Sequence, residues 1–161
     1  MISLKHKLGF AIVDDHKASS YHFIHQGRMD KTEKINYWCR LSDSDWIVAG
    51  HLMEKGDYPY ALFFGHLTLE KILKALFVAV KGGTPPLTHR LVYLASECDL
   101  SLTETQTELL EIVTDFNLEA RYPDEHLSFH NRCTKSFATD YMRRIEEMKQ
   151  WLQQKMPSSE T

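Results

Sequence analysis

The chain has 161 residues, 43% hydrophobic and 25% charged, which is the composition of an ordinary globular domain long enough to bury a core. The formal net charge of −3 excludes a global basic field that would attract nucleic acid, although a local basic patch is compatible with it. The 3 cysteines lie far apart without C-x-x-C spacing, which indicates reduced thiols and neither a disulfide framework nor a zinc site. No apolar run could serve as a signal peptide or span a bilayer, so we expect a cytoplasmic protein with no membrane partner.

Residues 1–28 differ from the rest of the chain because they show no sustained periodicity. His22 and His25 have H-x-x-H spacing, but no acidic residue or cysteine follows at the distance of a metal site. We therefore expect no metal and no cofactor. The sequence "MDKTEKINYW" from Met29 resembles a natural protein start, so we interpret residues 1–28 as a loosely packed N-terminal extension.

The first two helices are predicted at residues 31–55 and 59–81. Asp30 or Thr32 can cap the first helix, and "KGDYP" ends it with a glycine. Pro59 suits the first turn of the second helix, and "GGTPP" ends that helix. The Gly-Gly pair lacks the G-x-x-x-x-G-K-[ST] spacing of a phosphate loop, so we interpret it as a turn.

Three further helices are predicted after this turn. A short helix covers about residues 87–98, a longer one capped by Ser101 or Thr103 runs to about residue 117, and the last covers about 134–155. No segment alternates in the manner of a strand. We therefore predict an all-α, up-and-down four-helix bundle with one additional short helix, which spans residues 29–156 and is followed by a frayed tail at 157–161.

The helix at 59–81 is apolar on two sides. One arc is the predicted core face and contains Leu62, Leu69, Ile72, Leu73, Leu76 and Val80. Phe64, Leu67 and Val78 lie roughly opposite, beside Lys71. Because monomers usually avoid an exposed apolar patch of this kind, we expect these four residues to form the interface of a homodimer.

A polar line runs between these two arcs. His66, Glu70 and Lys74 are spaced i, i+4 and i+8. Glu70 and Lys74 have the acid-first order of a helical ion pair, which is worth about 0.3–0.5 kcal/mol when exposed. His66 lies inside the apolar arc, where a histidine is more often structural than catalytic. The line therefore needs no function to explain it.

Three motifs add a family resemblance: H-x-x-x-E-K-x-x-K-A-L at 66–76, T-H-x-L at 88–91 and A-R-Y-P-D at 120–124. Together they resemble the HEPN domain family, the "higher eukaryotes and prokaryotes nucleotide-binding" domains, over about residues 29–156. The resemblance implies a helical bundle, usually a homodimer, that acts beside a second protein. That protein is commonly a minimal nucleotidyltransferase of a toxin–antitoxin or related system. Some members are metal-independent endoribonucleases, and others are described as nucleotide binders or dimeric scaffolds.

The ribonuclease members of the family use an R-x(4–6)-H motif, which Arg121 and His126 match in spacing. Such a histidine can shuttle the proton of the RNA 2′-hydroxyl, and the arginine can hold the scissile phosphate. Two departures count against this assignment. Tyr122 replaces the usual polar residue, and Pro123 disfavours one continuous helix that presents both side chains.

Two other interpretations of the A-R-Y-P-D motif remain. In the first, Arg121 pairs with Glu70 or with Asp124 and completes a polar cluster that also contains His66 and Tyr122; we expect Glu70 and Arg121 to lie within salt-bridge reach. In the second, an anion site holds a nucleotide phosphate. The residues of this anion site are Lys71, Lys74, His89, Arg90 and Arg121.

The sequence thus favours a dimeric HEPN-like protein that is the partner or regulator of a minimal nucleotidyltransferase, with nucleotide binding as an additional activity. The alternative is a ribonuclease toxin that cleaves RNA with Arg121 and His126. A third interpretation is a helical interaction module without a ligand.

Overall fold

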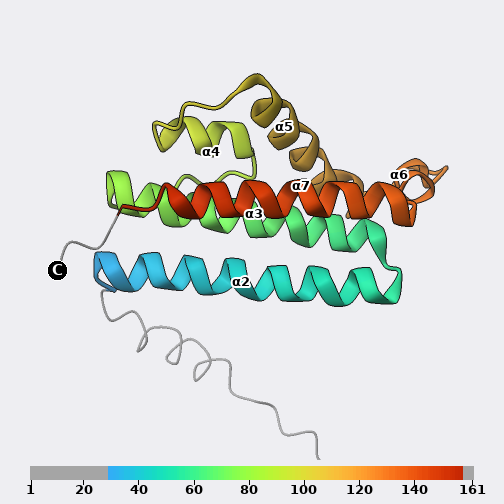
Figure 1. The fold of residues 1–161 in the computed structure, drawn as a ribbon, viewed down its shortest axis with the longest axis horizontal. Helices are drawn as coiled ribbons and strands as arrows, with labels where there is room; N and C mark the ends of the chain where they lie inside the picture. The colour runs from blue at the N-terminus through green and yellow to red at the C-terminus, as the bar shows by residue number, and fades with distance from the viewer. Residues whose placement is uncertain (1–28, 158–161) are drawn as a thin grey trace, which may run out of the picture.

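The computed structural model describes residues 29–157, and within that range the secondary structure consists of six helices and no strand (Figure 1). The predicted extension at 1–28 lies outside the described residues. The predicted all-α bundle is confirmed, with four long helices and two short ones, so the short α6 was missed. No helix of the described part is both long and apolar enough to cross a membrane. The helices are α2 (Lys31–Lys55), α3 (Tyr58–Lys81), α4 (Leu91–Glu97), α5 (Glu104–Glu119), α6 (Ser128–Arg132) and α7 (Lys135–Gln154).

The ends of α2 follow from local hydrogen bonding. The Asp30 carboxylate accepts from the backbone N–H of Glu33 at 2.8 Å, and the Glu33 carboxylate accepts from the backbone N–H of Asp30 at 2.8 Å. This reciprocal capping box satisfies two N–H groups that have no partner within the helix. Gly56 ends α2 with φ 83°, a left-handed conformation that glycine adopts without steric cost. The predicted bounds of this helix are therefore correct.

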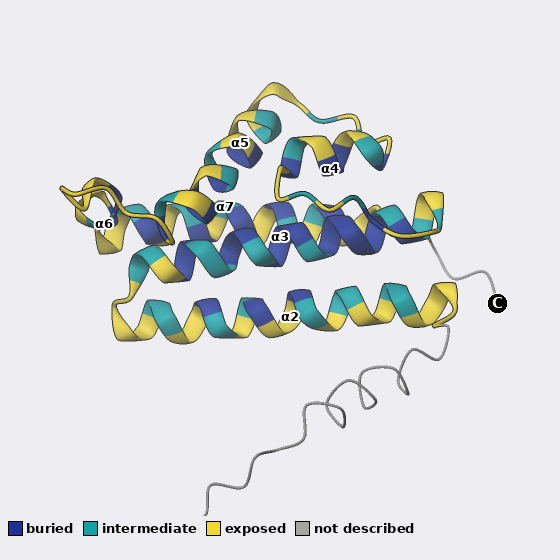
Figure 2. Cartoon of the chain, turned by 180° about the vertical axis from the view of Figure 1, so that it is seen from behind, coloured by how far each residue is buried: buried dark blue, intermediate teal, exposed yellow. Residues whose placement is uncertain are grey.

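Helix α3 is the central element of the bundle. It packs against α2, α4, α5 and α7, whereas α2 packs extensively against α3 alone among the described helices. Figure 2 shows α3 in front of α7, with α2 running along one side of it and α4 and α5 on the other. The strongly apolar composition predicted for 59–81 reflects this position, since 13 residues of α3 are buried.

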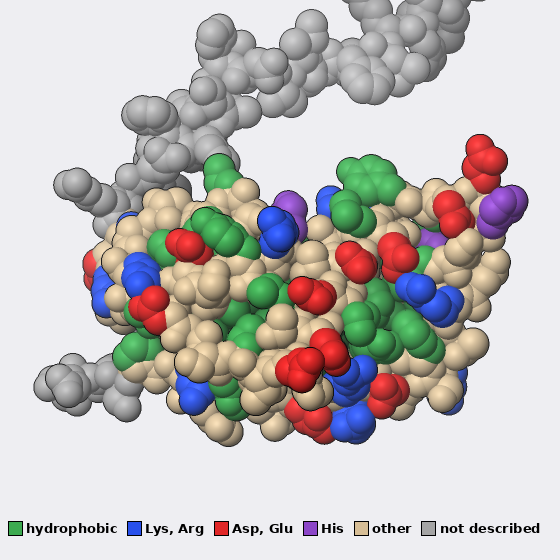
Figure 3. Space-filling model, turned by 90° about the horizontal axis from the view of Figure 1, so that it is seen from above, with side chains coloured by type: hydrophobic (Ala, Val, Ile, Leu, Met, Phe, Trp, Pro, Cys, Tyr) green, Lys and Arg blue, Asp and Glu red, His purple; other side chains and the backbone are tan. Residues whose placement is uncertain are grey.

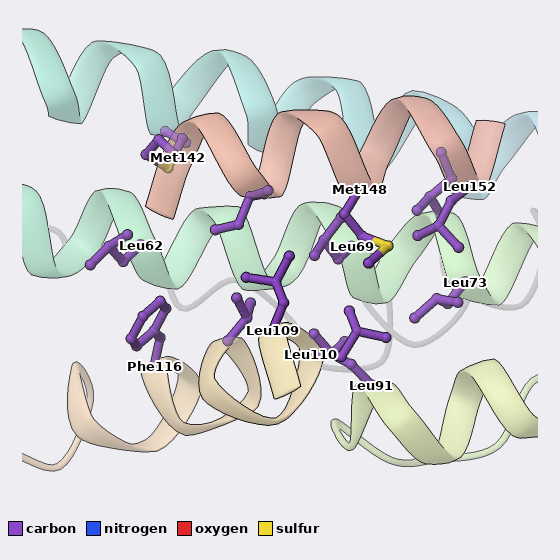
Figure 4. Close-up of a cluster of buried hydrophobic side chains, with 14 of the residues drawn as sticks. Leu62, Leu69, Leu73, Leu91, Leu109, Leu110, Phe116, Met142, Met148 and Leu152 are labelled. Atoms are coloured by element: carbon purple, nitrogen blue, oxygen red, sulfur yellow. The ribbon is translucent and has the colours of Figure 1, made fainter. Parts of the chain in front are cut away.

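The hydrophobic core lies between α3, α5 and α7 and is closed at one end by α4 (Figure 4). Leu62, Leu69, Ile72, Leu73 and Leu76 of the predicted core arc are each at most 1% exposed. Val80 of the same predicted arc lies in the last turn of α3 and is 43% exposed. From the other helices the largest fully buried side chains are Leu91, Leu94, Leu110, Phe116, Ile145 and Leu152.

Gly65 allows α7 to lie close to α3. A Cβ atom at this position would be 2.9 Å from Cδ1 of Ile145 and 3.4 Å from the sulfur of Met142. Gly50, in the exposed part of α2, has no neighbouring atom within 4 Å of the corresponding Cβ position. The two helical glycines therefore differ in packing and share the same intrinsic cost to the helix.

The Gly65→Ala substitution is expected to destabilise the protein, and Gly50→Ala is the matched control. Alanine gains about 1 kcal/mol of helix propensity over glycine at either position, but overpacking costs about 1–3 kcal/mol at Gly65. Urea denaturation should show Gly50→Ala to be more stable than wild type and Gly65→Ala less stable. Equal stabilisation by both substitutions would contradict the close approach of α7.

Candidate functional site

The polar line of α3 is buried and converges on one carboxylate. His66, Glu70 and Lys74 lie one turn apart and are 0%, 4% and 8% exposed. The Glu70 carboxylate accepts from Lys74 Nζ at 2.6 Å through Oε1. Its other oxygen, Oε2, lies 3.2 Å from His66 Nε2 and 2.8 Å from Nδ1 of His89, which comes from the loop before α4. The Glu70–Lys74 pair therefore forms, but in the interior of the domain rather than on its surface.

His66 is oriented by a contact outside α3. Its Nδ1 lies 3.1 Å from the backbone carbonyl oxygen of Val113 in α5. A carbonyl oxygen can only accept, so Nδ1 carries a hydrogen and donates it. The ring is thereby fixed with Nε2 directed at Glu70, and α3 is tied to α5 through the cluster.

The surroundings of Glu70 favour its ionised form. Burial by itself raises the pKa of this carboxyl, but hydrogen bonds from His66, Lys74 and His89, together with the charge of Lys74, outweigh it and lower the pKa to about 2. Glu70 is therefore a carboxylate at any physiological pH.

Helix α2 covers the cluster from the other side. The Lys74 ammonium lies 5.3 Å from the centre of the Trp38 ring, in a cation–π contact. Lys71 forms an ion pair with Asp45, which is 8% exposed. Ser42 is fully buried and donates to the backbone carbonyl of Thr68 at 2.8 Å. The few buried residues of α2 are therefore mostly polar, and the polar ones have partners on α3.

The A-R-Y-P-D segment lies apart from this cluster, so the expected Glu70–Arg121 ion pair is wrong. Arg121 Nε donates to the backbone carbonyl of Asn117 at 2.8 Å, and its guanidinium lies 5.6 Å from the ring centre of Phe63 and 5.3 Å from that of Tyr122. Phe63 precedes Glu70 by seven residues, about 10 Å along α3. The backbone turn after Glu119 and these ring contacts hold Arg121 beside the N-terminal part of α3, away from the cluster.

Asp124 does not pair with Arg121 either. Its Oδ1 accepts from the backbone N–H of Ser128 at 2.8 Å, and this bond lowers the pKa of the carboxyl. Asp124 thus helps to start α6. His126 is exposed on the same loop, and its backbone carbonyl accepts from the Asn131 side chain at 3.0 Å. Of the predicted polar cluster, the structure brings together His66 and Glu70 and leaves Tyr122 and Asp124 outside.

The residues predicted for an anion site are placed differently from one another. Lys74 and His89 lie together, but both donate to Glu70. Lys71 is paired with Asp45. Arg121 contacts Phe63 in the N-terminal part of α3 and is therefore separated from the two lysines. Figure 3 shows acidic, basic and apolar side chains interspersed over the face that carries α4 and α5, without a continuous basic area.

The residues predicted for a dimer interface lie beside α2. Phe64, Leu67 and Lys71 are half-buried within the single chain. Val78 is 1% exposed and belongs to the interior of the described domain, so it presents no surface to a second subunit. The first three residues remain candidates for an interface, and Val78 does not.

Sequence reasoning missed three parts of the site. His89 was assigned to an anion site, whereas its ring donates a hydrogen bond to the Glu70 carboxylate. Val113 contributes a backbone carbonyl, which leaves no trace in the sequence. Trp38 and Asp45 lie on α2, and only the register between α2 and α3 reveals that they contact Lys74 and Lys71. The T-H-x-L motif was the one available signal for His89.

The fold and the cluster define a helical domain with a buried His–Glu–Lys line on its central helix. The HEPN domain family matches residues 35–155, and the chain belongs to this family. The resemblance seen in the three motifs is thereby confirmed.

Among solved structures, the chain is similar to the crystal structure of TT1696 from Thermus thermophilus. The two share 22% sequence identity and superpose with a TM-score of 0.65, over 76% of this chain and 98% of the other. This likeness supports the fold alone. No curated protein matches the chain.

The depressed pKa of Glu70 predicts a specific pH dependence of stability. The pKa is about 2 in the folded protein against an ordinary value of 4.5, so the stabilisation by the carboxylate is fully present above about pH 4.5 and lost as the pH falls toward 2. The free energy of unfolding of wild type should therefore exceed that of Glu70→Gln at pH 7, and the difference should shrink between pH 5 and pH 3.

Chemical denaturation at a series of pH values measures this difference. Glu146→Gln changes an exposed glutamate of α7 and serves as the control, for which no comparable pH-dependent difference is expected. A difference between wild type and Glu70→Gln that stays constant from pH 7 to pH 3 would show that the three donors do not stabilise the carboxylate.

Proposed function

We propose that this HEPN protein is a non-catalytic dimer that acts as the partner or regulator of a minimal nucleotidyltransferase-like protein in a toxin–antitoxin type of system. The observation that supports it best is the incomplete covering of α2. This helix has 25 residues, yet its buried ones are only Ser42, Asp45 and Ala49. A long helix of a bundle ordinarily buries large apolar side chains.

The large apolar residues of α2 remain partly accessible. Trp38, Leu41, Trp46 and Val48 are half-buried, and Ile47 is 58% exposed. Phe64 and Leu67 of α3 are half-buried next to this helix. We refer to these seven residues as the α2–α3 surface. Burying it against another chain would remove apolar area from water, at about 25 cal/mol for each Å².

The placement of Arg121 and His126 favours binding over ribonuclease activity. The Arg121 guanidinium is engaged by Asn117, Phe63 and Tyr122 of its own chain. No hydrogen bond or ion pair of the described residues joins it to His126. A catalytic pair would have to be assembled from two exposed side chains on a loop.

The dimer is tested by size-exclusion chromatography with light scattering on the full chain. Wild type should have twice the monomer mass of 18.8 kDa. Leu67→Glu should lower the mass toward that of the monomer, because it places a charge in the α2–α3 surface. Leu118→Glu, at a 55% exposed apolar position of α5, is the control and should leave the mass unchanged. A monomeric wild type at micromolar concentration would contradict the dimer.

The partner is tested by co-expression with the nucleotidyltransferase-like protein encoded beside this gene. The two proteins should elute together, and the complex should be lost in Leu67→Glu but kept in Leu118→Glu. A genomic neighbourhood without such a protein, or separate elution of the two, would contradict the partner role. Nucleotide binding is tested in the same preparation, where millimolar ATP should raise Tm.

The exposure of both Arg121 and His126 supports ribonuclease activity as the second candidate, because two subunits could bring two such pairs to one RNA strand. RNA cleavage in the presence of EDTA, abolished in both Arg121→Ala and His126→Ala, would favour the enzyme over the non-catalytic partner. Absence of cleavage by wild type, or cleavage that survives both substitutions, would exclude it.

A further inference from the structure

Three side chains of types that commonly bind metals bring their potential ligand atoms together in the cluster. Nε2 of His66, a carboxylate oxygen of Glu70 and Nδ1 of His89 all lie within 4.8 Å of one another. The nitrogens are 3.2 Å and 2.8 Å from Oε2 of Glu70. In a tetrahedral zinc site, bonds of about 2.1 Å place neighbouring ligand atoms about 3.4 Å apart. The two nitrogen–oxygen separations are slightly shorter than this, so these ligand atoms would have to move a little apart to bind a metal.

The orientation of His66 is that of a metal ligand. Its Nδ1 donates to the Val113 carbonyl, so a neutral ring presents the lone pair of Nε2 to the Glu70 carboxylate. Without a proton or a cation between them, two acceptors would face each other at 3.2 Å in a buried position, which is unfavourable. A proton on Nε2 makes this contact the hydrogen bond described above, and a metal ion would take the place of that proton. A metal-bound histidine characteristically donates its other ring N–H to a backbone carbonyl, as His66 does.

Lys74 and His89 complete the arrangement. Lys74 holds Oε1 of Glu70 at 2.6 Å, so that Oε2 alone faces the two histidines, as in a carboxylate that binds metal through one oxygen. The His89 side chain is 59% exposed and comes from the loop between α3 and α4. This exposure provides a route by which an ion can enter from solvent.

We propose that His66, Glu70 and His89 bind one divalent transition-metal ion, and that zinc fits these ligands best. Two imidazoles and a carboxylate with an open fourth position are ligands that zinc uses, whereas magnesium prefers an all-oxygen shell. The Lys74 charge lies on the far oxygen of the carboxylate and weakens the attraction for a dication, so we expect moderate affinity. The sequence expectation of no metal did not consider these three residues together, because His89 lies nineteen residues from Glu70, in a separate motif.

Isothermal titration of the full chain with zinc chloride tests the site. The expected result is one zinc ion per chain, no heat with magnesium, and a Tm that rises with zinc and falls again with EDTA. His89→Ala changes an exposed residue and should keep the helical circular dichroism spectrum while weakening zinc binding by more than about tenfold. Glu70→Gln should have the same effect on binding.

Two control variants separate this site from other histidines. His126→Ala removes an exposed histidine of the loop before α6 and should bind zinc as wild type does. The double variant His22→Ala/His25→Ala removes the H-x-x-H pair and should retain the single ion. Zinc binding that survives His89→Ala, that disappears in the double variant, or that is absent from wild type would overturn the proposal.

Discussion

The Glu70 carboxylate is the constraint on which the centre of this domain depends. A carboxylate in a buried position is costly unless charged or hydrogen-bonded groups compensate for the lost water, and here three donors do so. One comes from each adjacent turn of α3 and one from the loop before α4. Removing a single partner of such a cluster leaves the others uncompensated, which costs more than any one contact contributes.

The cluster also fixes how the helices are arranged around α3. His66 reaches the Val113 carbonyl and so sets the register between α3 and α5, while Trp38 lies against Lys74 and Asp45 binds Lys71 from α2. Apolar packing alone would allow one helix to slide by a turn along its neighbour. These polar contacts are directional and each group has few possible partners, so they allow only one register. The same groups that require compensation therefore specify one arrangement of the bundle.

The sequence predicted the helices well because their ends are local. Asp30 and Gly56 bound α2 through hydrogen bonds to residues within a few positions, so composition and spacing were sufficient. The site was predicted only in part. One helix shows the line of His66, Glu70 and Lys74. The third donor to Glu70, however, is His89 from a loop, and the contacts of Arg121 depend on how the helices pack. Val78 was assigned to a dimer face because a helical wheel does not show which neighbour covers which side.

The distribution of polar and apolar groups separates two roles within one small bundle. The buried polar cluster faces α4 and α5 and is satisfied inside the chain, so it needs no partner protein to be stable. The α2–α3 surface shows the opposite pattern, since its side chains are apolar and only half-covered. A partner that covers α2 would bury Trp38 further and exclude water from Lys74 behind it. Association at this surface would thereby strengthen the electrostatic contacts of Glu70, because ion pairs gain strength as water is excluded.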